Sequence, residues 1–213
     1  MQEKFTNRTL TVFLHALGGF MFALLPIPGL AQRINFSTWT PNSEITITPL
    51  AATALNFNQK KPVLIAGSEQ VSISLTDTQT VAYRIEAPEG YDLTVEVIAP
   101  DVLTLGGTGS TKVDERIPFT LSMAYNNLQA GDEPSAKSGA VQVPAGFYNM
   151  TFPVTRRTLG APGPPPTPES GENFVRTKAT AWLFFYGNLG PIGNVIAGQY
   201  AGDITINVYL STY

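Results

Sequence analysis

Regular alternation of apolar and polar residues near the C-terminus places the strongest constraint on how this chain can fold. From Ile204 to Leu210, aliphatic side chains at every second position alternate with Thr, Asn and Tyr. Successive side chains of an extended strand point to opposite faces, so this segment predicts a strand with one buried face. Similar alternation at residues 71–75 and 93–97 adds two more apolar faces for the same core.

The remainder of the chain also favours an all-β fold. Residues typical of strands are interrupted by Gly, Pro, Asn and Asp at intervals typical of a β-sandwich, and no useful length shows a helical period. Pro88, Glu89 and Gly90 predict a turn between two of the strands. The predicted strands are residues 44–48, 54–57, 70–75, 80–86, 92–98, 116–125, 150–155, 177–186 and 203–210.

The first 31 residues have the pattern of an export signal. Lys4 and Arg8 precede an apolar run over residues 10–25, and small residues around Ala31 offer a cleavage site. The run is about 16 residues long, whereas about 20 are needed to cross a bilayer. We therefore expect a signal peptide at 1–31, no stable membrane span in the mature chain, and a protein in the periplasm, at the cell surface or outside the cell.

The mature segment, 32–213, is expected to form a single β domain that carries a Pro/Gly-rich insertion at about 126–173. Within this insertion, residues 161–168 contain too many prolines to take part in a sheet ladder. We expect an exposed loop with polyproline character over 159–172. A solvated insertion and a docking motif for a partner are the two interpretations.

Histidine and cysteine usage excludes most catalytic chemistry. The only histidine, His15, lies in the predicted signal, and the chain has no cysteine. The mature protein therefore cannot form a Ser-His-Asp or Cys-His nucleophile, or a zinc, haem or iron–sulfur site with the usual ligands. A formal net charge of −3 excludes a strongly basic nucleic-acid-binding surface. We expect no cofactor and no enzyme activity.

Carboxylates and aromatic residues are the remaining candidates for function. Asp132 and Glu133 are expected to be solvated loop charges, with a calcium site or a glycosidase pair as the alternatives. Trp182 lies on a strand that is apolar on both faces, so its outer face is either covered by the insertion or exposed as a contact surface. Phe147 and Tyr148 form a second candidate aromatic contact at a loop tip.

Three stretches of the chain resemble a family of uncharacterised secreted bacterial β-sandwich proteins, itself similar to spore coat protein U and the archaic chaperone–usher pilins. The final stretch is the most specific of the three, because a turn containing Gly198, Tyr200 and Gly202 leads into the alternating strand. Asn58 stands where the family usually has Gly, and the disulfide of many pilins is missing. The resembling stretches are residues 45–57, 81–98 and 197–209.

The resemblance implies an immunoglobulin-like sandwich and, for the pilin relatives, one that lacks its last strand. Such a groove accepts an extended segment of another chain. It implies further copies of the chain, a periplasmic chaperone and an usher as partners. The candidate donor residues are Ile34, Phe36, Ile45 and Ile47, and the candidate acceptor edge contains Ile204, Ile206, Val208 and Leu210.

Two functional hypotheses follow. The first is a structural or adhesive surface protein, a pilin-like fibre subunit assembled by donor-strand exchange. The second is a secreted binding module for surface glycans or proteins that uses Phe147, Tyr148 or Trp182. For the first hypothesis, the N-terminal segment either inserts into another copy or folds back into its own sandwich.

Overall fold

The structure is a computed structural model, and it describes residues 32–62, 64–156 and 177–211. The predicted signal at 1–31 and the proline-rich loop at 159–172 lie outside the described residues. The described residues form a curled, mixed sheet of 12 strands. The prediction of an all-β protein is therefore confirmed.

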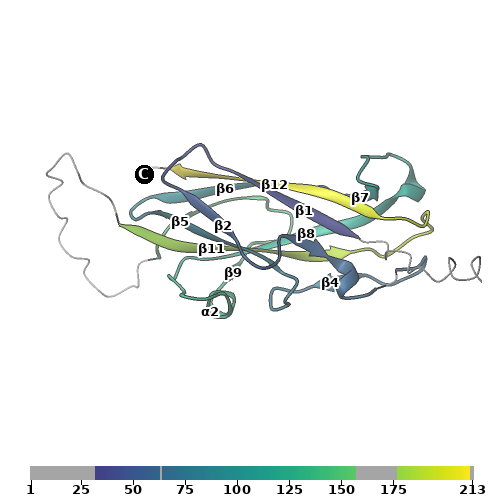
Figure 1. Cartoon of the computed structure of the whole chain (residues 1–213), viewed down its shortest axis with the longest axis horizontal. Helices are drawn as coiled ribbons and strands as arrows, with labels where there is room; N and C mark the ends of the chain where they lie inside the picture. The colour runs from purple at the N-terminus through teal and green to yellow at the C-terminus, as the bar shows by residue number, and fades with distance from the viewer. Residues whose placement is uncertain (1–31, 63, 157–176, 212–213) are drawn as a thin grey trace, which may run out of the picture.

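The curled sheet has two layers that face each other (Figure 1). The first contains β3 (Ala54–Asn56), β1 (Arg33–Trp39), β12 (Tyr200–Ser211), β6 (Asp92–Ile98), β10 (Asn149–Pro153) and β7 (Val102–Leu105). The second contains β2 (Thr46–Pro49), β5 (Val81–Pro88), β11 (Lys178–Leu189), β8 (Arg116–Asn126), β4 (Val71–Ile73) and β9 (Val141–Gln142).

β8 connects the two layers because it changes partner along its length. Its first residues pair with β7, where Ile117 lies opposite Leu103, and from Phe119 onward it pairs with β11. Pro118 lies at the point of change, and proline has no N–H to donate to a continuous ladder. The chain therefore crosses from one layer to the other within a single strand.

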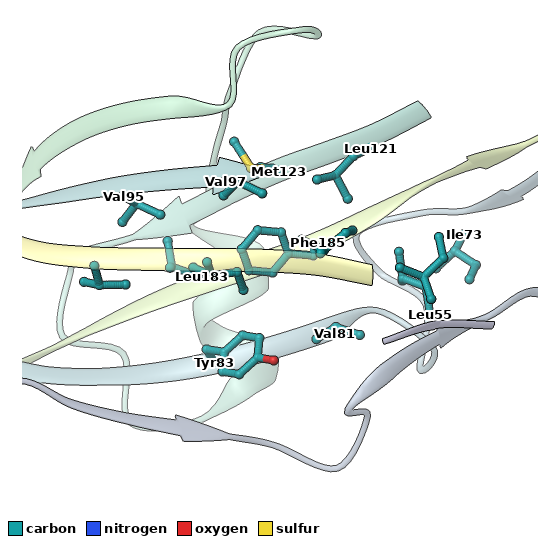
Figure 2. Close-up of a cluster of buried hydrophobic side chains, with 14 of the residues drawn as sticks. Leu55, Ile73, Val81, Tyr83, Val95, Val97, Leu121, Met123, Leu183 and Phe185 are labelled. Carbon is teal, nitrogen blue, oxygen red and sulfur yellow. The ribbon is translucent and has the colours of Figure 1, made fainter. Parts of the chain in front are cut away.

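The core fills the space between the layers. Its side chains come from the inward positions of alternating strands, such as Val95 and Val97 on β6 and Leu183 and Phe185 on β11. Figure 2 shows these residues converging with Leu121 from the neighbouring β8. Because this core uses aliphatic and aromatic packing throughout, the fold needs no disulfide.

All nine predicted strands are present, most of them with shifted ends. β6 has the predicted bounds, and β12 begins three residues before the predicted 203–210 and ends one residue after it. The predicted turn is also present, with Gly90 at a φ of 83°. β1, β7 and β9 were not among the predicted strands.

A short helix, α2 (Glu133–Ser138), replaces the loop that was expected at this point. Asp132 caps it, because its Oδ1 accepts a hydrogen bond of 2.8 Å from the Ser135 amide. This bond also lowers the pKa of Asp132. Glu133 forms an ion pair of 2.7 Å with Lys137 one turn later. No helix among the described residues is long and apolar enough to cross a bilayer.

Candidate functional site: the strand place beside β12

β12 pairs with strands of different origin on its two sides, and its first two residues also pair with β7. On one side it pairs antiparallel with β6, where Val208 lies opposite Val95. On the other side it pairs parallel with β1, from Arg33 opposite Ala201 to Trp39 opposite Asn207. The strand beside the C-terminal strand therefore comes from the other end of the described chain, and it runs in the same direction (Figure 1).

The four candidate donor residues lie on two separate segments. Ile34 and Phe36 are on β1, whereas Ile45 and Ile47 follow a loop that crosses to the second layer. Ile45 is buried, and Ile47 lies on β2 opposite Ile85. Only Ile34 and Phe36 lie beside β12, so of the candidate donor residues only those on β1 pair with the candidate acceptor strand.

Phe36 connects β1 to the opposite layer. Its ring lies 5.4 Å from the Phe185 ring and 6.4 Å from the Tyr83 ring, measured between centroids. Ile34 is fully buried beside Leu55 of β3. Burial raises the pKa of Tyr83 to about 12.

The candidate acceptor residues point into the core from β12. Ile204, Ile206 and Val208 are buried, and Leu210 is half-buried. Phe36 lies opposite Ile204 in the parallel register. In this structure the acceptor edge is occupied by β1 of the same chain, which corresponds to the folded-back arrangement.

Polar side chains add contacts along the parallel pair. Asn35 Nδ2 donates to Asp203 Oδ1 at 3.3 Å, and Ser37 Oγ donates to Thr205 Oγ1 at 3.3 Å. Past the end of β1, Asn42 Oδ1 accepts from the Leu210 amide at 3.2 Å. The first two contacts are exposed to solvent, so they fix the register more than they stabilise the pair.

The three candidate aromatic residues have different surroundings. Trp182 is only 3% exposed, because the second apolar cluster on the outer face of β11 is covered by Ala136 of α2. Its indole N–H donates to the Ala130 carbonyl at 3.0 Å. Tyr148 is half-buried, whereas Phe147 is 63% exposed. Of the three, Phe147 alone presents most of its ring to solvent.

The described residues show little that supports metal binding. No group of three His, Cys, Asp or Glu in the described ranges has the spacing of a metal site. A largely apolar cavity of about 350 Å³ lies near the first residues of β1 and β12, with Gln32, Ile117 and Tyr200 in its wall. The Tyr200 hydroxyl donates to the Ile196 carbonyl at 2.7 Å, so this polar group is already paired.

Comparison of the sequence with protein-family models and with curated proteins finds no match. The functional argument therefore rests on the strand arrangement around β12.

Proposed function

We propose that the protein is an exported, non-catalytic structural or adhesive subunit with a pilin-like, immunoglobulin-like sandwich, whose copies assemble by exchange of β1. One observation carries this proposal. The place beside β12 is filled by an N-terminal strand in parallel orientation, and not by a strand that continues from β12 in a hairpin.

The contacts that hold β1 in place are available between two copies as well as within one. They are the ladder with β12, the short pairing with β3, and the packing of Ile34 and Phe36. A fully buried aliphatic or aromatic side chain contributes about 1.5–3 kcal/mol. A β1 strand from another copy makes equivalent contacts, so the exchange itself costs little.

The relative direction of β1 and β12 also favours exchange of β1 between copies. A parallel ladder is slightly less stable per residue than an antiparallel one. Within one copy, the loop that follows Trp39 leads to β2 and holds β1 parallel to β12. A strand from a second copy is free of this connection and can enter in the antiparallel direction. Assembly would then gain an antiparallel ladder over the seven residue pairs with β12 and lose one over the three pairs with β3, while Ile34 and Phe36 could still point inward.

The folded-back strand also explains how a single copy avoids aggregation. Without β1, the backbone of β12 from Ala201 to Asn207 would have unpaired N–H and C=O groups at an open edge. With β1 in place these groups are covered. The closed arrangement is then the resting form, and release of β1 starts assembly.

The exposed ring of Phe147 favours one alternative, a binding module for surface glycans or proteins. Gly146, with a φ of 83°, and the bond from the Phe147 amide to the Pro144 carbonyl form the turn that presents this ring. The Phe147→Ala variant would lose binding to such a partner without a change in oligomeric state.

A disulfide between β1 and β12 is expected to lock the monomer and prevent assembly. Ser37 and Thr205 are opposite each other, and their hydroxyl oxygens lie 3.3 Å apart, within reach of a disulfide after substitution. The natural chain has no cysteine that could compete. Oxidised Ser37→Cys/Thr205→Cys protein should stay monomeric by light scattering at concentrations where reduced protein assembles.

The single variants Ser37→Cys and Thr205→Cys serve as controls, because neither can form the internal bond. Assembly of the oxidised double variant at the rate and extent of its reduced form would contradict the proposal.

A further inference from the structure

The outer face of the first layer carries a row of aromatic and polar side chains across three strands. Trp39 on β1 lies opposite Asn207 on β12, and Asn207 lies opposite Glu96 on β6. All three occupy outward positions, because their neighbours along each strand, such as Val208 and Val95, point into the core. The register therefore places an aromatic ring, an amide and a carboxylate side by side.

Tyr209 contacts both Trp39 and Glu96, the residues at the two ends of this row. Its ring lies 5.7 Å from the Trp39 ring with the planes at 70°, an edge-to-face pair. Glu96 is a diagonal neighbour of Tyr209 in the register of β12 and β6, because Tyr209 lies opposite Thr94 and Asn207 opposite Glu96. Partial burial, the charge of Glu96 and a hydrogen bond to it raise the pKa of the Tyr209 hydroxyl. Trp39 is 51% exposed, so much of its ring surface is open to a ligand.

The charges around this cluster favour a cationic ligand. Glu96 supplies a carboxylate, and the faces of the two aromatic rings attract positive charge. On β1, the nearest basic side chain is Arg33 at the opposite end of the strand, six residues from Trp39. β6 and β12 carry no Lys or Arg at all. An anionic ligand would therefore meet repulsion without a compensating cation.

Neutral polar groups surround the cluster. Thr94, two residues before Glu96 on the same face of β6, has its Oγ1 2.9 Å from Thr151 Oγ1 on β10 and 3.3 Å from Ser211 Oγ on β12. With the Asn207 amide, these hydroxyls offer both donors and acceptors at an exposed surface. They suit a ligand rich in hydroxyl groups better than an apolar peptide or a lipid.

We propose that Trp39, Tyr209 and Glu96 bind the ammonium group of an amino sugar, in a glycan whose amines are not acetylated. The ammonium lies against the aromatic rings and the Glu96 carboxylate, and the sugar hydroxyls bond to Asn207 and the neighbouring threonines. The site goes beyond the proposed function. It needs Trp39 opposite Asn207, a register that β1 has in the closed monomer and that a strand entering in the antiparallel direction would not reproduce, so binding also favours the closed monomer.

Calorimetric titration of the full chain with a glucosamine hexamer tests this site. We expect saturable binding that weakens with added salt, and binding of the N-acetylglucosamine hexamer at least tenfold weaker. Trp39→Ala and Glu96→Gln should each weaken binding of the glucosamine hexamer about five- to tenfold. Val113→Ala and Glu69→Gln are controls, because they remove an exposed apolar side chain and an exposed carboxylate elsewhere.

Three results would overturn the proposal. They are an equal affinity of the natural chain for the acetylated and the glucosamine hexamer, an equal loss of affinity in Glu69→Gln and Glu96→Gln, and the absence of binding of the glucosamine hexamer to the natural chain. Choline that binds as tightly as the hexamer would overturn the assignment to a sugar. Glu96 lies on β6, away from the exchanged strand, so Glu96→Gln tests the site without disturbing β1. Light scattering on the same samples separates failure of this site from failure of strand exchange.

Discussion

Deletion of residues 33–39 is expected to abolish the soluble monomer. Without β1, the β12 edge loses its partner from Ala201 to Asn207, and the apolar groups beneath Ile34 and Phe36 meet water. Size-exclusion chromatography should show aggregates or higher oligomers, and thermal melting should lose its cooperative transition. A truncated protein that remains monomeric and melts like the full chain would contradict the role of β1.

A synthetic peptide covering residues 32–40 should restore the monomer-sized species when added to the truncated protein. The matched control carries Asp at both Ile34 and Phe36, because a charge is costly at the buried position of Ile34 and at the half-buried position of Phe36. Rescue by the natural peptide but not by the control would show that the place beside β12 accepts a strand without a covalent connection.

Gly187→Ala is expected to destabilise the protein by about 3 kcal/mol or more. Gly187 lies on β11 between β4 and β8, opposite Ile73 and Leu121. A Cβ at this position would overlap the Thr120 carbonyl oxygen, which belongs to the backbone of β8 and cannot rotate away. The two central strands would have to separate, with loss of core packing on both sides.

The matched control for this substitution is Gly193→Ala. A Cβ at Gly193 meets no atom within 4 Å, and its backbone does not have a positive φ. Urea unfolding should therefore give a midpoint close to that of the natural protein for Gly193→Ala and a much lower one for Gly187→Ala. Equal midpoints for the two variants would show that β11 and β8 are less tightly packed than the structure has them.

Local patterns predicted the strands but not their partners. The alternation of apolar and polar residues was sufficient to predict β6 and β12 as strands, because each has one buried and one more exposed face. The pairing of β1 with β12 joins residues 168 positions apart, such as Ser37 and Thr205, and no local pattern encodes that distance. Ile34 and Phe36 were predicted as candidate donor residues, but the parallel direction of their strand depends on the whole fold.

The surroundings of the candidate aromatic residue Trp182 were left open by the sequence. Trp182 lies on a strand with two apolar faces, and the sequence left its outer face either covered or exposed. The structure covers it with α2, a helix of six residues that is too short to show a period. A signal for it was present, because Asp132 precedes Glu133 and Pro134 in the order of a helix start.

The cluster of Trp39, Tyr209 and Glu96 was not predicted at all. Each residue belongs to a different strand, and they meet only through the register of β1, β12 and β6. Trp39 ends a strand that was not among those predicted. A site of this kind depends on pairing over long distances in the sequence, so residue spacing alone carries no signal for it.

Cross-linking between two different copies tests the strand exchange most directly. One copy carries Ser37→Cys, and the second carries a single cysteine in place of Asp203, Thr205, Asn207 or Tyr209, the outward positions of β12. After incubation under assembling conditions and oxidation, we expect mixed dimers at one or more of these positions. A partner copy with Glu69→Cys, far from β12 in the sequence and exposed, gives the background. Mixed dimers no more abundant than this background at all four positions would contradict the proposal that β1 of one copy pairs with β12 of another.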